Sequence, residues 1–449
     1  MAVPSVAYGV MRGGETLALG AFGLADKAGI PATTKTPYSM ASITKPMTST
    51  AVMLLAERGL VDLDAPIDRY LPEPLVSKAG TPQEATVRRV ADHTAGLPLH
   101  YQFYYADEPD QRPPFAETIR RYGKTFTAPG EKHHYSNLGY GMLDALIERV
   151  SHGSYAEFMA EAIFSPLGME AVIGAPEQRA VPYGPDGVGY PPYDFDHPGG
   201  SAAYASVEDL LAFGRFHLSQ GPSLLSIESR NNMQQATAQI EESRGYGFGW
   251  GVSNRHGRKI VQHTGGMGGV NTILRLVPEL DLVIAVLVNG QSELPFRAAD
   301  DALAALDPIF AQGLETERAK PKLQNERTPV PTSLQGGWNG TIETYKDFLP
   351  FSLEIQSGTE ALARLDGQES FVEDLALVNG RLVGVFDGDV RTEDAARQPY
   401  RIHLDLGHSQ SEMIGAAVTI SRPPSGEGGA KGKRLGNALA YWTEAHWTA

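Results

Sequence analysis

Two groups of strand-like segments, one at the N-terminus and one beginning at Tyr246, constrain the fold more than any other feature of this sequence. Val6 to Ala25 alternates apolar and other residues around a Gly13-Gly14 turn, which is typical of a β-hairpin. The second group contains the apolar runs 246–252, 259–263, 272–277 and 282–288, joined by short turns. The economical arrangement is a single antiparallel sheet built from both groups.

Between the two groups, residues from about 60 to 240 are rich in helices and loops. Leu143, Leu146, Ile147 and Val150 form an i, i+3, i+4, i+7 stripe, which predicts an amphipathic helix. Ser154 and Glu157 have the spacing of a capping box. A further helix from about Pro295 to Ala311 is expected to cover the sheet. We therefore expect an α+β fold in which a helical insert packs beside the sheet and leaves a cleft between them.

The strongest chemical signal is the segment Ser42-Ile43-Thr44-Lys45, where a helix is expected to begin. A spacing of three residues places the hydroxyl and the amine on one helical face. A serine is a weak nucleophile until a neighbouring base accepts its proton, and a lysine with a lowered pKa can do so. The pattern therefore predicts a serine hydrolase that uses lysine beside the nucleophile.

Two further motifs follow, namely Tyr135-Ser136-Asn137 and His263-Thr264-Gly265-Gly266. The three motifs in this order resemble those of the serine beta-lactamase and penicillin-binding-protein superfamily, where S-x-x-K, Y-x-N and K/H-T-G line one cleft. That superfamily includes class C beta-lactamases, D,D-peptidases, D-aminopeptidases and family VIII esterases. The likeness extends over residues 3 to about 312 and implies a beta-lactamase/transpeptidase-like fold.

The resemblance implies a role for each motif residue. Ser42 is the expected nucleophile, and its backbone N–H, with that of Gly266 on an edge strand, forms the expected oxyanion hole. Lys45 and Tyr135 are both candidates for the general base, and the sequence does not decide between them. The remaining motif residues are expected to bind substrate: Asn137, His263, Thr264 and Gly265. If His263 is protonated, its charge would help to lower the pKa of Lys45.

The C-terminal part of the chain has a different pattern. Residues 1–312 are assigned to the hydrolase domain, and residues 313–332 are polar, charged and proline-bearing, as in a linker. Residues 333–449 contain short, closely spaced β-like runs, which suggest an up-and-down antiparallel barrel. The domain resembles the lipocalin-like domain that some superfamily members carry. Its segment from Pro423 to Lys433 is expected to be a mobile loop.

Composition limits the partners. The 449 residues carry a formal charge of −15, which disfavours nucleic acid and anionic membranes. No cysteine is present, so thiol nucleophiles, disulfides and cysteine-bound metals are excluded. We expect no cofactor, a small-molecule or peptide substrate, and either a monomer or a homo-oligomer. No signal peptide or membrane span is apparent, which favours a soluble cytoplasmic protein or a trimmed exported one.

Other polar clusters have plainer interpretations. His133 and His134 would face opposite ways on an extended segment, so a shared metal is not expected. Asp194, Asp196 and His197 could bind a cation, but they precede a glycine turn that is structural in the superfamily. His93 and Thr94 are expected in a buried turn, and the aromatic segments 101–105 and 190–195 in either the pocket or the core.

Three functions follow from these observations. The first is hydrolysis of amide or peptide bonds next to D-amino acids, as in a D-aminopeptidase or D,D-carboxypeptidase. The second is carboxylesterase activity on short-chain esters. The third is a binding protein that is acylated but does not turn over.

Overall fold

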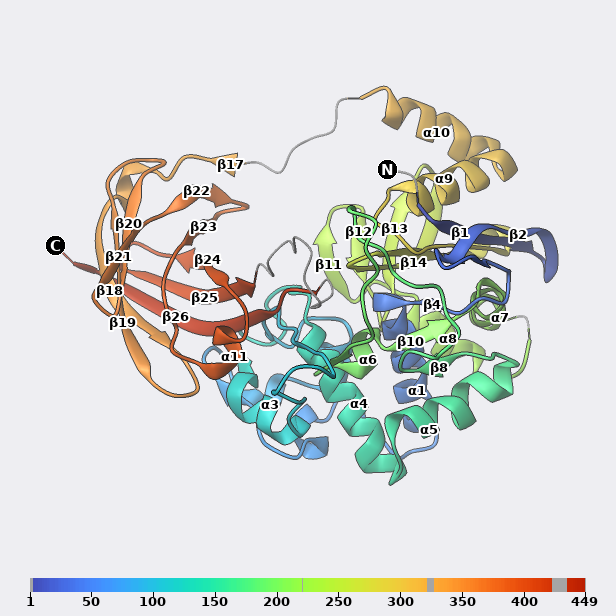
Figure 1. Cartoon of the computed structure of the whole chain (residues 1–449), viewed down its shortest axis with the longest axis horizontal. Helices are drawn as coiled ribbons and strands as arrows, with labels where there is room; N and C mark the ends of the chain where they lie inside the picture. Colours follow the sequence, from blue (N-terminus) through green and yellow to red (C-terminus); the bar gives the residue numbers. More distant parts are fainter. Residues whose placement is uncertain (1–2, 220, 321–326, 422–433, 449) are drawn as a thin grey trace.

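The computed structural model describes residues 3–219, 221–320, 327–421 and 434–448. It contains two parts, a catalytic part with a sheet, helices and an insert, and a C-terminal β-domain beside the insert (Figure 1). The predicted mobile loop from Pro423 to Lys433 lies outside the described residues.

Both groups of strands pair in one antiparallel sheet, as predicted. Within the described ranges this sheet has nine strands in the order β11-β12-β13-β14-β15-β16-β1-β2-β3. The N-terminal strand β1 pairs with β16 in a register that joins Val6 to Val288. The strand bounds are β1 Ser5–Arg12, β2 Glu15–Asp26, β3 Ile30–Pro31, β11 Ala238–Glu241, β12 Arg244–Tyr246, β13 Gly251–Arg255, β14 Arg258–Met267, β15 Val270–Val277 and β16 Leu282–Val288.

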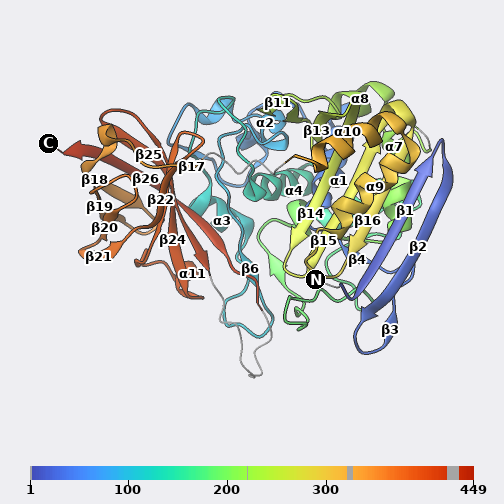
Figure 2. The same cartoon turned by 90° about the horizontal axis from the view of Figure 1, so that it is seen from above.

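Helices cover both faces of this sheet. On one face α9 packs against β15 and β16, with α10 beside it, and on the other face α7 packs against β1 and β16 (Figure 2). Helix α1 is buried on every side from Thr44 to Leu55, because the insert helix α4 also packs against it. The helix bounds are α1 Thr44–Glu57, α2 Val87–Ala91, α3 Phe115–Tyr122, α4 Asn137–Ser151, α5 Tyr155–Met159, α6 Pro198–Ser201, α7 Val207–His217, α8 Ile227–Met233, α9 Leu294–Leu306 and α10 Pro308–Arg318.

The helix expected from Pro295 to Ala311 is in fact two helices, α9 and α10. The chain is extended at Asp307, with φ −139° and ψ 105°, and Pro308 starts the second helix. The Asp307 carboxylate caps α10 by accepting from the backbone N–H of Ile309 and Phe310, and a proline is favoured at the first helical position. Residues 313–318, which the sequence places in the linker, are the last turns of α10.

The C-terminal part is an antiparallel half-barrel. Its described strands follow the order β17-β22-β23-β24-β25-β26-β18-β19-β20-β21, so β17 and β21 lie at the two edges. The Trp338 ring is fully buried at its centre. The bounds are β17 Arg327–Thr328, β18 Gly336–Glu343, β19 Phe348–Ile355, β20 Ala361–Leu365, β21 Gln368–Phe371, β22 Glu373–Val378, β23 Arg381–Phe386, α11 Glu393–Ala396, β24 Tyr400–His408, β25 Glu412–Ser421 and β26 Ala438–Thr448.

The two parts are in direct contact through the insert. Tyr101 and Ala438 form an antiparallel β-bridge, and the Lys124 ammonium lies 3.0 Å from the Glu343 carboxylate. Short strands complete the catalytic part: β4 Tyr38–Ser39, β5 Val76–Ser77, β6 Phe103–Tyr104, β7 Lys124–Thr125, β8 Val172–Ile173, β9 Asp194–Phe195 and β10 Ala203–Ala205. Among the described residues, no helix combines the length and apolarity needed to cross a bilayer.

Candidate active site

Ser42 lies in a tight 3₁₀ turn, Ala41–Ile43, that leads directly into α1. The preceding residue, Ala41, is buried and has a φ of +46°. Such a backbone conformation is costly for a residue with a Cβ, and it persists only where the surroundings enforce it. The strained turn aims Ser42 into the cleft, although α1 itself begins two residues later than the sequence suggests.

Lys45 is fully buried beneath Ser42. Its Nζ lies 3.2 Å from Ser42 Oγ, 2.7 Å from Asn137 Oδ1 and 2.9 Å from the Gly200 carbonyl oxygen. Burial lowers the pKa of Lys45 well below its usual value, because a buried ammonium loses its hydration. A neutral amine within hydrogen-bond reach of a serine hydroxyl has the properties of a general base.

Tyr135 and Asn137 reach the site from the start of α4. Ser136 caps that helix by accepting from the Gly139 N–H, and its own hydroxyl donates to the Pro98 carbonyl. This anchoring places Asn137 against Lys45. Burial raises the pKa of Tyr135, and a hydrogen bond with Ser42 only partly opposes that shift.

His93 packs against Tyr135 and is buried, in agreement with the buried turn expected from sequence. Its ring lies 4.3 Å from that of Tyr135, and its Nδ1 accepts from the Ser136 N–H at 3.2 Å. His93 itself has a φ of +64°. The conformation of the Tyr135 loop is therefore fixed by contacts on both sides.

His263, Thr264, Gly265 and Gly266 lie on β14, which is an interior strand and not the edge strand expected from sequence. It pairs with β15 on one side and with β13 on the other. The pairing with β13 ends at Gly251 opposite Gln262. Residues 263–267 therefore present a local edge toward Ser42, because β13 is too short to cover them.

His263 is neutral, which corrects the suggestion that its charge acts on Lys45. Burial and the nearby Lys45 lower the pKa of His263 to about 3. Its Nδ1 lies 2.8 Å from the Thr264 carbonyl oxygen, which can only accept, so Nδ1 carries the proton. Nε2 then accepts from the Tyr246 hydroxyl at 2.8 Å. The sequence contains no motif that points to Tyr246. The antiparallel pairing of β12, β13 and β14 brings Tyr246 to His263.

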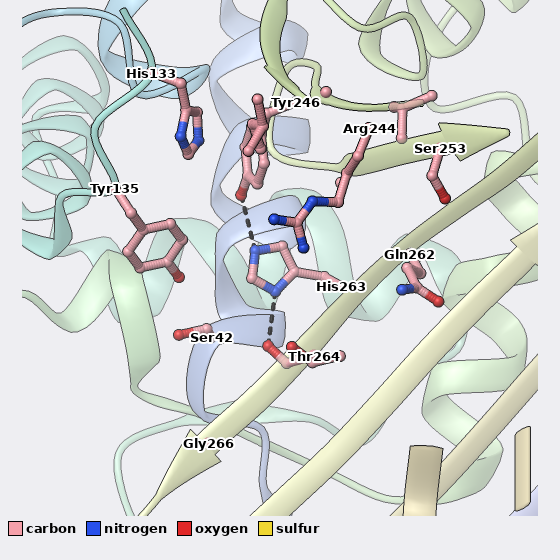
Figure 3. Close-up of a pocket in the computed structure, with 14 residues that line it drawn as sticks. Ser42, His133, Tyr135, Arg244, Tyr246, Ser253, Gln262, His263, Thr264 and Gly266 are labelled. Atoms are coloured by element: carbon pink, nitrogen blue, oxygen red, sulfur yellow. Dashed lines mark hydrogen bonds between the residues drawn. The ribbon is translucent and has the colours of Figure 1, made fainter. Parts of the chain in front are cut away.

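Two pockets meet at Ser42 and Gly266. The first has a volume of about 380 Å³, and Ser42, Tyr135 and His263 face the same cavity, as Figure 3 shows. Arg244 and Gln262 also line it. The second pocket, of about 360 Å³, is bordered by Asn137 and His197 and by aromatic residues of the insert. Its lining also includes Tyr101, Phe103, Tyr190, Met267 and, from the C-terminal part, Arg434, Leu435 and Gly436.

Each of the other polar candidates has its own contacts. His134 Nδ1 bonds to the Leu97 carbonyl, while His133 lines the first pocket, so the two rings do diverge. Asp194 pairs with Arg112, whereas Asp196 is buried between imidazoles. In the described ranges no three carboxylate or imidazole groups are placed to hold a metal ion.

The fold and the contact between Ser42 and the buried Lys45 are those of a serine hydrolase. The chain belongs to the Beta-lactamase family, whose family model matches residues 1–308. Penicillin-binding protein 4* of Bacillus subtilis is 26% identical over 81% of this chain and 82% of its own length. D-aminopeptidase of Gluconobacter oxydans is 27% identical over 74% of this chain and 62% of its own length. Esterase EstB of Burkholderia gladioli is 31% identical over 54% of this chain and 72% of its own length.

Solved structures confirm the predicted fold over nearly the whole chain. The octameric penicillin-binding protein homologue from Pyrococcus abyssi aligns with a TM-score of 0.60 at 22% identity, covering 92% of this chain and 94% of its own. The structure of SurE with D-Leu aligns with a TM-score of 0.61 at 20% identity, and the alignment covers 98% of this chain and 95% of SurE. A class C beta-lactamase from Rhodobacter sphaeroides aligns with a TM-score of 0.56 at 22% identity, and the alignment covers 71% of this chain and 95% of that enzyme.

Proposed function

We propose that this chain hydrolyses amide or peptide bonds next to D-amino acids through an acyl-Ser42 intermediate. The observation that carries the proposal is the distance of 3.2 Å between Ser42 Oγ and the fully buried Lys45 Nζ. Such a contact can move a proton from the hydroxyl to the amine as the hydroxyl attacks a carbonyl carbon.

In the proposed mechanism, neutral Lys45 accepts the Ser42 proton during attack. The tetrahedral oxyanion is stabilised by the backbone N–H groups of Ser42 and Gly266. Tyr135, whose phenol stays protonated because of its raised pKa, can pass a proton to the leaving group and recover one from Lys45. Asn137, held by Lys45 through Oδ1, presents its amide N–H₂ to a substrate carbonyl. Water then releases the acyl group by the reverse transfers.

The choice of D-amino acid substrates is supported by the relatives of this chain. A D-aminopeptidase and penicillin-binding proteins are among the relatives over most of the chain. The second pocket is aromatic enough to bind an apolar side chain on the acyl half of a substrate. The test is paired hydrolysis of D- and L-phenylalanine p-nitroanilides and p-nitrophenyl butyrate. Cleavage of the D-anilide alone among the anilides is expected.

A carboxylesterase is the second candidate, and similarity to esterase EstB favours it. It would cleave the butyrate ester and leave both anilides intact. A third possibility, an acylated binding protein, would release one equivalent of p-nitrophenol per chain and then stop. The three outcomes are distinct in one assay.

The arrangement also predicts which group sets the pH dependence. Activity requires neutral Lys45, so kcat/KM should be high above the lowered pKa of Lys45 and fall as the pH drops through it. His263, with a pKa of about 3, stays neutral throughout the neutral and mildly acidic range. His263→Gln should therefore lower kcat/KM by the same factor at every pH. The pH at which kcat/KM falls to half of its maximum should not change. A change in that pH would assign the fall at low pH to His263.

We propose that the C-terminal domain completes the substrate pocket. A Cβ built on Gly268 would lie 2.3 Å from Leu435 Cδ2, so the strand end and the C-terminal segment are in close contact. Leu435→Ala should lower kcat/KM for a D-phenylalanyl substrate by about tenfold, with little effect on a butyryl ester, because an apolar pocket loses contacts only with the bulkier group. Leu353→Ala, in the barrel core, is the control. Equal losses in both variants would mean that loosening of the barrel is responsible.

We further propose that the chain forms two folded units, as the division 1–312, 313–332 and 333–449 suggests, with residues 313–318 belonging to the first unit as the end of α10. One structural neighbour is octameric, which supports a homo-oligomer as a hypothesis for this chain. Light scattering of the full chain measures its mass in solution.

A further inference from the structure

A buried carboxylate flanked by two imidazoles lies behind the second pocket. Asp196 Oδ2 is 2.6 Å from His100 Nε2, and Asp196 Oδ1 is 2.6 Å from His197 Nδ1. The backbone N–H of Gln102 also donates to Oδ1, at 3.1 Å. All three side chains are almost completely buried. The proposed mechanism uses none of them.

The protonation of this cluster follows from its contacts. Burial alone would raise the pKa of Asp196, but its interactions with His100 and His197 lower it below the usual range. An ionised carboxylate accepts only, so His197 Nδ1 carries the proton. Burial lowers the pKa of His197 despite Asp196, which leaves the imidazole neutral. Its Nε2 therefore carries a lone pair.

His197 lines the second pocket together with Ser42 and Asn137. In the part of the chain that the structure describes, His197 has its hydrogen bond at Nδ1 and none at Nε2. Two other polar groups in the pocket are already engaged. Asn137 Oδ1 accepts from Lys45, and Arg434 pairs with Asp107 and Glu108.

Gly200 brings this cluster close to the catalytic groups. A Cβ built on Gly200 would lie 3.1 Å from His197 Cδ2 and 3.4 Å from Lys45 Nζ. The absence of a side chain there lets the imidazole and the amine both approach the same part of the cleft. A substrate group bound at His197 would thus lie near the acyl carbon attached to Ser42.

We propose that His197 Nε2, held by Asp196, accepts a hydrogen bond from a free ammonium group on the acyl half of the substrate. The enzyme would then select acyl groups that carry an amine next to the scissile carbonyl. A lone pair backed by an ionised carboxylate suits a cation, and the charge of Arg434 in the same pocket is balanced by its two carboxylate partners. A substrate without the amine would leave Nε2 buried and unpaired, which is the arrangement that discriminates most strongly. This inference rests on the proposed acyl-Ser42 chemistry.

The test compares three p-nitrophenyl esters that share a leaving group and a carbon skeleton: D-phenylalanyl, N-acetyl-D-phenylalanyl and 3-phenylpropanoyl. Esters are used because both leading functions include ester cleavage. Each kcat/KM is divided by the rate constant for uncatalysed hydrolysis of the same ester, because an α-ammonium group by itself activates the carbonyl. Wild-type enzyme should prefer the D-phenylalanyl ester over the 3-phenylpropanoyl ester by at least about tenfold in kcat/KM.

Two variants test whether His197 causes the preference for the D-phenylalanyl ester. His197→Leu, which has no acceptor, should lose most of this preference, measured as the ratio of kcat/KM for the D-phenylalanyl and 3-phenylpropanoyl esters in the same variant, so that a general loss of activity cancels. His197→Gln, which keeps an acceptor and a donor for Asp196, should retain part of it. A wild-type enzyme without the preference overturns the proposal and needs no variant. So does a preference for the N-acetyl ester, or a preference that survives unchanged in His197→Leu.

These outcomes are separable from failure of the proposed function. If Ser42-dependent turnover of the 3-phenylpropanoyl ester is observed, the hydrolase assignment stands whatever the amine preference. If no ester is turned over in a Ser42-dependent manner, the proposed function itself fails.

Discussion

Replacement of Ser42 with alanine is expected to lower kcat by about 10⁴-fold or more for every substrate that the enzyme hydrolyses. The substitution removes the oxygen that lies 3.2 Å from Lys45 Nζ and that forms the acyl bond in the proposed mechanism. Lys45 keeps its contacts with Asn137 and Gly200, so the fold and the melting temperature should change little. The rate is measured with p-nitrophenyl butyrate and the D-phenylalanine anilide.

Ser49→Ala is the matched control, because it is the same substitution further along the same helix. Ser49 is buried and bonds to the Tyr140 hydroxyl at 3.1 Å, but it lies outside both pockets. We expect activity within a few fold of wild type. Comparable losses in the two variants would indicate that packing of α1, rather than chemistry at Ser42, limits the rate.

Replacement of Lys45 with methionine is the second largest expected effect. The side chain keeps nearly the same length and volume but has no base, so kcat should fall by about 10²- to 10⁴-fold. Asn137 Oδ1 and the Gly200 carbonyl lose a donor at the same time, which costs about 1 to 3 kcal/mol for a buried acceptor left unpaired. We expect a rate that is lower by this factor and a near-ultraviolet circular dichroism spectrum like that of the wild type.

Lys45→Arg distinguishes loss of the base from loss of the contacts. A guanidinium remains protonated in proteins, so it can donate to Asn137 and Gly200 but cannot accept the Ser42 proton. We expect this variant to be as inactive as Lys45→Met, although buried charge lowers its stability. Substantial activity in either variant would transfer the role of base to Tyr135.

Local signals in the sequence predicted much of the fold. The Gly13-Gly14 turn and the alternating strands on either side form β1 and β2 as expected, with φ values of +58° and +79° at the two glycines. The Ser154 and Glu157 capping box starts α5. These features depend on neighbouring residues alone, which is why the sequence carries them.

The features that the sequence did not predict depend on contacts between distant segments. The local edge at His263 exists because β13 ends early, and the neutrality of His263 follows from burial beside Lys45. The half-barrel and the entry of Leu435 into the pocket require knowledge of how the two parts pack. The sequence does not reveal the partner of Asp196 and His197, because the second imidazole, His100, lies 96 residues from Asp196.

The central claim is that Ser42 carries the acyl group, and trapping that group tests it most directly. The enzyme is mixed with p-nitrophenyl butyrate, quenched in acid during steady-state turnover, digested and analysed by mass spectrometry. We expect a butyryl adduct on the peptide that contains Ser42, and we expect this adduct to be absent in Ser42→Ala. Turnover with the adduct on another residue, or activity that persists in Ser42→Ala, would contradict it.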